Sequence, residues 1–326
     1  MDKEHIIEVE GLAKRFQEVK ALESVSFQVN RGEIFGFLGP NGAGKTTTIN
    51  ILTGLARPDA GTIRLNGLDC AGDPKRIQGL IGVVPDESNL YPELTGFENL
   101  CFCASLYGLN RRTREDRAGR LLEEFGLVEA KDRKFAGYSK GMKRKLTIAA
   151  GIVHQPELLF LDEPTTGIDT ASARRIRELI RRLNRDGCTV FLTTHYLEEA
   201  ERLCDRVAFI VKGRIVRIET VAALMSGFQD RKTILFAVSH TPPRLHERLE
   251  EKFPGVACER VSETSLRLRS GENIELIPFI QFFQDQQVEV LEARRVGPSF
   301  EDVFIEVTGL ESEILKDDRA GQGKGK

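Results

Sequence analysis

The chain carries Gly39-Pro40-Asn41-Gly42-Ala43-Gly44-Lys45-Thr46 between an apolar run, Glu33–Leu38, and a helical segment, Thr46–Leu55. This octapeptide matches the pattern G-x-x-x-x-G-K-[ST] at every fixed position. Its glycines let the backbone curl so that successive N–H groups point into one small volume, and the helix that follows adds its positive end. Lys45 supplies a mobile charge for the β- and γ-phosphates, and the Thr46 hydroxyl is a magnesium ligand. The segment therefore predicts a phosphate-binding loop between a strand and a helix.

A second motif is Leu158-Leu159-Phe160-Leu161-Asp162-Glu163, in which two carboxylates follow four apolar residues. At the tip of a buried strand, Asp162 would orient the ligand shell of a magnesium ion. Glu163 would stand just beyond it, placed to polarise a water for in-line attack on the γ-phosphate. A strand followed by a helix N-cap would give the same pattern. The motif favours nucleotide hydrolysis only in combination with the glycine loop.

The bulk composition is that of a globular protein, because 40% of the 326 residues are hydrophobic and 29% are charged. With a net charge of −2, we expect no nucleic-acid partner. No segment approaches the roughly 18 apolar residues of a membrane-spanning helix, and the first residues lack a secretory signal, so we expect a cytoplasmic protein. Among the six cysteines only Cys101 and Cys103 are close, and they lack the second ligand pair of a structural zinc site.

Strands and helices alternate along the first part of the chain, which predicts an α/β domain with a largely parallel sheet. We expect this domain to cover residues 1–228, with a helical insertion at residues 86–137 where the pattern becomes helical. The expected strands are Ile6–Val9, Val25–Val29, Glu33–Leu38, Thr62–Leu65, Ile81–Val84, Leu158–Leu161, Thr189–Thr193 and Arg206–Ile210, and a charged helix is expected at Thr170–Asn184.

A smaller second domain is expected over residues 229–310. Its expected elements are strand Thr233–Val238, helix Pro243–Lys252, strands Val256–Arg260 and Ser265–Arg269, helix Ile274–Phe283, strand Val288–Ala293 and a last helix, Ser299–Val307. The β-α-β-β-α-β order at the heart of this series is typical of an α+β, ferredoxin-like domain. Residues 311–326 are polar and glycine-rich, which predicts a disordered tail.

Three further motifs follow in order: Tyr138-Ser139-Lys140-Gly141-Met142, Pro164-Thr165-Thr166-Gly167-Ile168-Asp169, and Thr194-His195. Together with the two motifs above, they make the chain resemble the nucleotide-binding subunit of an ABC transporter. More narrowly, it resembles the ABC-2 exporter group that includes daunorubicin-resistance and sodium-export ATPases. The resemblance is close over roughly residues 4–225, and Pro298–Phe304 resembles part of an appendix that many members carry. It implies a P-loop NTPase fold of the ABC type, with ATP and Mg²⁺ as cofactors.

The resemblance also implies roles for residues that match the family's motifs. Ser139 and Gly141 match the signature segment, which in such proteins caps the γ-phosphate of ATP held by the opposite protomer. A small hydroxyl and an unhindered N–H at a helix start suit an anion. Asp169 would lie at the dimer seam and His195 would contact the γ-phosphate. Phe16 stands where the family places an aromatic residue under the adenine, with a core phenylalanine as the alternative.

The predicted site is therefore a composite of several segments. Its catalytic residues are Lys45, Glu163 and His195, and its magnesium ligands are Thr46, Asp86 and Asp162. The expected nucleotide contacts are Phe16, Gly39, Pro40, Asn41, Gly42, Ala43, Gly44, Lys45, Thr46, Thr47, Asp86, Ser139, Gly141 and Asp162.

Three positions depart from the family's pattern. Asp86 stands where the family usually has Gln at the entry to the helical insertion, so its coupling role is open. Lys140 and Met142 replace the usual glycine and glutamine of the signature, while the two residues nearest phosphate are retained. The run Lys143-Arg144-Lys145 is more basic than usual, and we expect it to form a solvated helix face.

These expectations add up to an ATP-hydrolysing subunit that works as a homodimer on a separate membrane permease, on the cytoplasmic face of the membrane. The helical insertion would pass the dimer's motion to the permease. A soluble ABC ATPase of translation or DNA repair is the alternative, but it predicts a second glycine loop or a long coiled coil, and neither is present. A GTPase should carry an N-K-x-D element, which is also absent. A regulator that binds ATP without hydrolysing it is a further alternative, and Glu163 argues against it because the candidate water-activating carboxylate is in place.

Overall fold

The computed structural model describes residues 4–70, 74–227, 232–271, 275–297 and 299–310. The chain divides into two units, one made of residues 1–221 with 307–326 and the other of residues 222–306. Each unit is described by itself. The predicted tail, residues 311–326, lies outside the described residues.

The first unit is built on a mostly parallel sheet with the strand order β10-β9-β3-β8-β7-β6. Its strands are β3 (Ile34–Leu38), β6 (Ile81–Val84), β7 (Leu158–Asp162), β8 (Thr189–Thr194), β9 (Arg206–Val211) and β10 (Arg214–Thr220). Every residue of β3, β7 and β8 is buried, as expected for strands covered on both faces. These three strands pair in parallel, so their carboxyl ends meet at one edge. β10 was not predicted; it pairs antiparallel with β9 at the sheet's margin.

A second, antiparallel sheet lies against the first and has the order β2-β1-β4-β5. Its strands are β1 (His5–Phe16), β2 (Val19–Asn30), β4 (Ala60–Leu65) and β5 (Leu68–Asp69). Phenylalanines from both sheets form a shared core around the ring of Phe191, whose centroid lies 5.5–5.9 Å from those of Phe27, Phe35, Phe37 and Phe160. This aromatic cluster holds the two sheets together.

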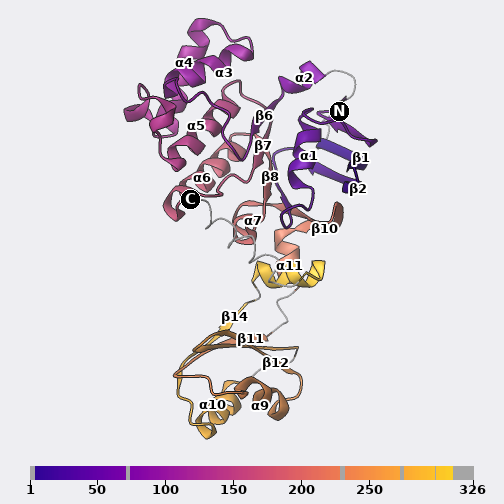
Figure 1. Ribbon diagram of the computed structural model, residues 1–326, viewed down its shortest axis with the longest axis vertical. Helices are drawn as coiled ribbons and strands as arrows, with labels where there is room; N and C mark the ends of the chain where they lie inside the picture. Colours follow the sequence, from indigo (N-terminus) through magenta and orange to yellow (C-terminus); the bar gives the residue numbers. More distant parts are fainter. Residues whose placement is uncertain (1–3, 71–73, 228–231, 272–274, 298, 311–326) are drawn as a thin grey trace. The chain divides into compact units, whose positions relative to one another are not determined.

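The helices of this unit are α1 (Lys45–Leu52), α2 (Pro74–Gln78), α3 (Gly96–Leu106), α4 (Arg111–Glu124), α5 (Lys140–Ile152), α6 (Thr170–Arg185) and α7 (Leu197–Leu203). Figure 1 shows α3 and α4 together beyond the β6 side of the sheet, whereas α1 lies beside β1 and β2. Thr95 starts α3 with a capping box to Glu98, and Ser139 and Asp169 cap α5 and α6. α1 ends at Leu52, earlier than predicted, because Gly54 turns into the left-handed region.

The second unit forms an antiparallel sheet with the order β12-β13-β11-β14. The elements that lie wholly or mostly in it are α8 (Val221–Ser226), β11 (Lys232–Val238), α9 (Leu245–Lys252), β12 (Val256–Ser262), β13 (Ser265–Ser270), α10 (Leu276–Asp285), β14 (Val290–Val296) and α11 (Phe300–Thr308). Phe236, Leu268 and Phe283 belong to its core. α10 and β14 lie about two residues later than predicted, with a left-handed turn at Gln287 between them. The predicted helix start, Ile274, is outside the described residues.

Within the described part of the chain, no helix combines the length and the apolar character needed to cross a lipid bilayer.

Replacing Phe191 by Ala should lower the free energy of unfolding of the first unit by about 3–5 kcal/mol, because the ring fills the space between two sheets. The chain has no Trp and its four tyrosines, Tyr91, Tyr107, Tyr138 and Tyr196, all belong to this unit. Tyrosine fluorescence during urea unfolding therefore measures the stability of this unit alone.

The matched control is Phe236→Ala, which removes a fully buried ring from the second unit. The tyrosine-monitored midpoint should stay at the wild-type value. An equal shift for both variants would mean that the two units unfold together.

Candidate nucleotide-binding site

The loop at residues 39–46 leaves the end of β3 and turns sharply into α1. A Cβ at Gly39 would lie 2.1 Å from the Ile210 carbonyl oxygen, and one at Gly44 would lie 2.6 Å from that of Ala21. Gly44 also has a φ of 109°, which residues with a side chain rarely adopt. Both glycines are therefore required where the loop passes against neighbouring backbone. Gly44 also provides no side chain to cap the start of α1, and a helix start of this kind suits an anion.

Lys45 begins α1, and its side chain curls back over the loop. Its Nζ donates hydrogen bonds to the carbonyl oxygens of Gly39, at 2.8 Å, and Pro40, at 3.2 Å. Only 6% of Lys45 is exposed, so its charge is concentrated inside the loop. Of the next two residues at the start of the helix, Thr46 is exposed and Thr47 is half-buried.

Glu163 follows the last residue of β7 and faces two of the predicted catalytic residues. Its Oε1 lies 3.6 Å from Lys45 Nζ, and its Oε2 lies 2.9 Å from His195 Nδ1. The Thr166 hydroxyl donates a third contact to Oε2 at 3.1 Å. The structure thus brings Lys45, Glu163 and His195 together from three different loops, each at the carboxyl end of a parallel strand.

These neighbours set the charge state of Glu163. Burial alone would raise the pKa of this carboxyl, but the contact and charge of His195, the charge of Lys45 and the Thr166 hydroxyl outweigh it. The net pKa lies below the ordinary value, so Glu163 is a carboxylate at neutral pH. A general base has to be in that form.

Asp162 is the last residue of β7 and is buried beside Glu163. The Thr193 hydroxyl of β8 donates a hydrogen bond to its Oδ1. The side chain is thereby fixed at the strand tip where the sequence placed it. Thr193 was not among the predicted residues, although its position one residue before Thr194-His195 puts it on the neighbouring strand.

Ser139 and Gly141 lie at the start of α5. The Ser139 hydroxyl accepts from the Met142 N–H at 3.3 Å and so caps the helix. A Cβ on Gly141 would lie 2.7 Å from the Ser172 hydroxyl of α6. Asp169 accepts from the Ser172 N–H at 2.9 Å and caps that second helix. The two helix starts therefore form one surface of their own.

Phe16 ends β1, and 50% of the residue is exposed. Lys14 Nζ lies 5.3 Å from the centre of its ring. The alternative of a core phenylalanine is wrong, since half of the side chain faces solvent.

Asp86 lies two residues after β6 and contacts Arg144, whose burial was not predicted from the sequence. Its Oδ1 lies 3.3 Å from the guanidinium of Arg144. Arg144 is buried, so the expected solvated face at Lys143-Arg144-Lys145 is wrong for its middle residue. Helical spacing contains the missed signal, because position 144 shares one helix face with the buried positions 141, 148 and 151.

Glu199 of α7 is a second buried polar residue that the sequence analysis missed. It accepts a hydrogen bond from the Thr165 hydroxyl at 2.8 Å, which ties the segment after Glu163 to the helix after His195. Burial raises the pKa of Glu199, and the bonds from Thr165 and Thr194 oppose that rise only in part. No simple pattern marked this residue among its acidic neighbours.

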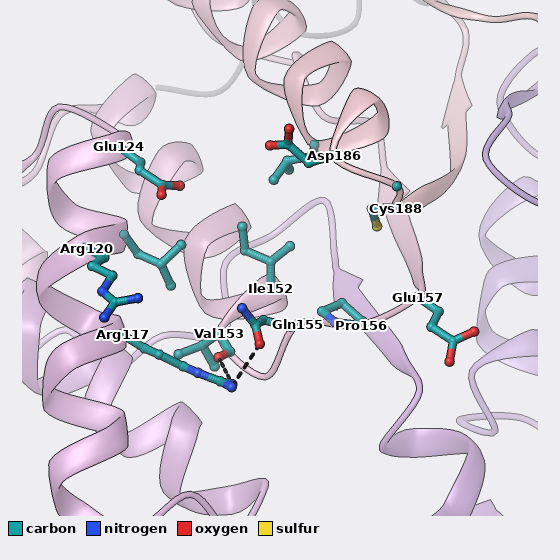
Figure 2. Close-up of a pocket in the computed structure, with 13 residues that line it drawn as sticks. Arg117, Arg120, Glu124, Ile152, Val153, Gln155, Pro156, Glu157, Asp186 and Cys188 are labelled. Carbon is teal, nitrogen blue, oxygen red and sulfur yellow. Dashed lines mark hydrogen bonds between the residues drawn. The ribbon is translucent and has the colours of Figure 1, made fainter.

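A separate pocket of about 650 Å³ lies at the amino ends of β7 and β8, away from the predicted residues. Figure 2 shows Arg117 of α4 reaching across it to donate to the Val153 carbonyl, at 3.0 Å, and to the Gln155 side chain, at 2.9 Å. Its other charged lining residues, Arg120, Glu124, Glu157 and Asp186, have both signs. Arg117 acts here as a brace between α4 and the end of α5.

Comparison with known proteins identifies the family. The family model described as "ABC transporter" matches residues 22–166. The linearmycin resistance ATP-binding protein LnrL of Bacillus subtilis is 41% identical over 234 residues, which cover 72% of this chain and 75% of that protein. The daunorubicin/doxorubicin resistance ATP-binding protein DrrA of Streptomyces peucetius is 36% identical over 97% of this chain and 96% of its own length. Nod factor export ATP-binding protein I of Ralstonia nicotianae is 45% identical over 64% of this chain and 65% of its own.

Solved structures agree with these relatives. An ATP-binding subunit of an ABC transporter superimposes with a TM-score of 0.63 at 35% identity, over 68% of this chain and 93% of its own. CbiO1 of Clostridium perfringens, part of the ABC transporter complex cbiONQ, has a TM-score of 0.63 at 25% identity, over 69% and 92% of the two chains. The dimeric bacterial ABC transporter cassette MJ0796 has a TM-score of 0.61 at 26% identity, over 66% and 98%.

The chain therefore belongs to the ABC transporter family, as the ATP-binding and ATP-hydrolysing subunit of an exporter.

Proposed function

We propose that ATP binds with its phosphates in the loop at residues 39–46 and is hydrolysed by a water that Glu163 polarises. The observation that carries this proposal is the position of Glu163, 3.6 Å from Lys45 and 2.9 Å from His195. Lys45 would turn from the loop carbonyls to the β- and γ-phosphates, and His195 would contact the γ-phosphate. Phe16 would stack under the adenine, since its exposed ring is available for a base.

The residues present also fit a magnesium ion. Thr46 places an exposed hydroxyl in the first turn of α1, and Asp162 places a carboxylate at the neighbouring strand tip. Hydroxyl, carboxylate and phosphate oxygens are the ligands that Mg²⁺ prefers. When bound, the ion would neutralise charge on the phosphate oxygens. Asp86 is the third proposed ligand. Its carboxylate is half exposed and already contacts Arg144, so we propose that it binds the ion through a water molecule.

We further propose that two copies of the chain close on two ATP molecules. Ser139 and Gly141 lie at the start of α5, next to Ser172 and its capping partner Asp169 at the start of α6. In the proposed homodimer this surface faces the ATP held by the partner. The dimeric cassette MJ0796 supports this arrangement in a relative.

The closing motion would reach a separate permease through residues 86–109, on the cytoplasmic face of the membrane. This segment exposes Tyr91, Phe102, Leu106 and Tyr107, and exposed apolar side chains in one region are typical of a protein contact. The relatives' names refer to antibiotic resistance and to Nod factor export. In the proposed complex the permease, and not this chain, lines the transport pathway.

We propose the domain limits 1–228, with the insertion at 86–137, and 229–310. For the second domain we propose a ferredoxin-like fold, supported by the order β11-α9-β12-β13-α10-β14 and by the sheet order β12-β13-β11-β14. This domain would stabilise the dimer or contact the permease.

Replacing Glu163 by Gln should lower kcat for ATP hydrolysis by about 100-fold or more, because the amide cannot accept the water's proton. ATP binding should persist, and the variant should accumulate as an ATP-bound dimer in size-exclusion chromatography with light scattering. Glu157→Gln is the matched control, since Glu157 is an exposed carboxylate just before the other end of β7. Hydrolysis by Glu163→Gln at the wild-type rate would refute the catalytic assignment.

Replacing Lys45 by Ala should weaken ATP binding by at least about tenfold, because a charge-assisted contact to phosphate is lost. Equilibrium titration with a fluorescent ATP analogue measures the change. Lys20→Ala, which removes an exposed lysine of β2, should leave the affinity unchanged. Equal affinities for the wild type and Lys45→Ala would contradict the placement of the phosphates.

A further inference from the structure

Arg144 is a buried guanidinium that joins three separate segments of the first unit. It belongs to α5, and its Nη1 donates to the Pro85 carbonyl oxygen at 2.6 Å. Its Nη2 donates to Asp86 Oδ1 at 3.3 Å and to the Glu163 carbonyl oxygen at 2.7 Å. One side chain therefore ties the helix that starts at Ser139 to the loop after β6 and to the residue after β7.

Burying the positive charge of Arg144 costs free energy unless all three hydrogen-bond acceptors are present. Arg144 is 7% exposed, and burial lowers the pKa of its guanidinium while Asp86 raises it. A planar guanidinium can satisfy several acceptors at fixed angles, which a lysine ammonium cannot reproduce. Loss of the group would leave two carbonyl oxygens and one carboxylate without this donor. The contact set is therefore specific to arginine.

The bond to Glu163 acts on a strained residue. Glu163 has a φ of 48°, in the left-handed region that a residue with a side chain avoids at a cost of about 1–3 kcal/mol. Its N–H donates to the Thr193 carbonyl at 3.1 Å, and its own carbonyl accepts from Arg144. The backbone is thus held on both sides. Arg144 supplies the half of this clamp that comes from the helical region.

The helix connects this clamp to the surface proposed to meet the partner's ATP. Ser139 caps α5 and Arg144 lies in its second turn, about 7 Å further along a rigid helix. A displacement of Ser139 therefore moves the guanidinium together with the helix. Because the guanidinium holds Glu163, the position of α5 is passed on to the carboxylate.

We propose that Arg144 is a positioning residue for hydrolysis, which sets the Glu163 backbone according to the position of α5 and uses Asp86 as its counter-charge. The proposal rests on the function proposed above, in which Glu163 polarises the water. A role for Asp86 as the counter-charge of Arg144 also explains why this chain has Asp86 at the position where the family usually has Gln. A carboxylate forms an ion pair with Arg144, and a neutral amide does not.

The test compares Arg144→Lys, Asp86→Asn and the double variant in steady-state ATP hydrolysis. We expect kcat to fall by about 10- to 100-fold for Arg144→Lys, because a small misplacement of a catalytic group has effects of this size. The KM for ATP should change little, since Arg144 does not touch the nucleotide loop. The two single effects on kcat should be less than additive in the double variant. Lys143→Met, which removes a neighbouring cation of the same helix, should behave as the wild type.

A second measurement separates positioning from folding and from dimer formation. Arg144→Lys in the Glu163→Gln background should still give the ATP-bound dimer, and tyrosine-monitored urea unfolding should show that it is fully folded without urea. A wild-type kcat for Arg144→Lys, with Glu163→Gln inactive, would overturn this inference alone. Fully additive effects of Arg144→Lys and Asp86→Asn would overturn the role of Asp86. Activity of Glu163→Gln itself would instead overturn the proposed function.

Discussion

The site depends on the parallel pairing of β3, β8 and β7, which end at the same edge of the sheet. Lys45, His195 and Glu163 each follow one of these strands, and only the strand order brings their side chains within 3.6 Å. The strands hold this order because every residue in them is buried and because Phe191 packs against rings from both sheets. A packing defect in the core would therefore separate groups that are far apart in the sequence.

Charges buried at this edge compensate one another. Lys45 faces the carboxylate of Glu163, and both are held by further polar contacts to the loop carbonyls, to His195 and to Thr166. A buried charge without partners would cost several kcal/mol, so these contacts are conditions of folding as well as of chemistry. The same contacts keep the pKa of Glu163 low, which suits a base, while burial keeps the pKa of nearby Glu199 high. The pKa values of two carboxyl groups that follow neighbouring strands are thus shifted in opposite directions.

The sequence predicted those parts of the site that local patterns specify. The glycine loop needs residues that tolerate its backbone, and Asp162 and Glu163 end an apolar strand, so both could be placed from the sequence. Arg144 was misplaced because a run of three basic residues suggests a solvated face, whereas its acceptors come from two distant loops. β10 and the exact limits of α10 and β14 were missed or shifted, because edge pairing and turn position depend on tertiary contacts. The family resemblance suggested roles for the residues of the motifs, but it did not predict the contacts that join one motif to another.

Arg144 shows why those connections matter in the proposed dimer, where each site is shared between two chains. Glu163 contacts Lys45 and His195 of its own chain, whereas Ser139 and Gly141 lie at the start of α5, the surface proposed to meet the partner's ATP. If the two halves were independent, hydrolysis in one chain would not depend on what the other chain binds. A buried guanidinium fixed to α5 and hydrogen-bonded to the Glu163 backbone would remove that independence in the proposed dimer, because neither group can move without the other losing a partner. The Asp86 carboxylate extends the same link to the entry of the helical insertion. In the proposed transporter this charged connection would join the ATP contact, the catalytic geometry and the segment that faces the permease.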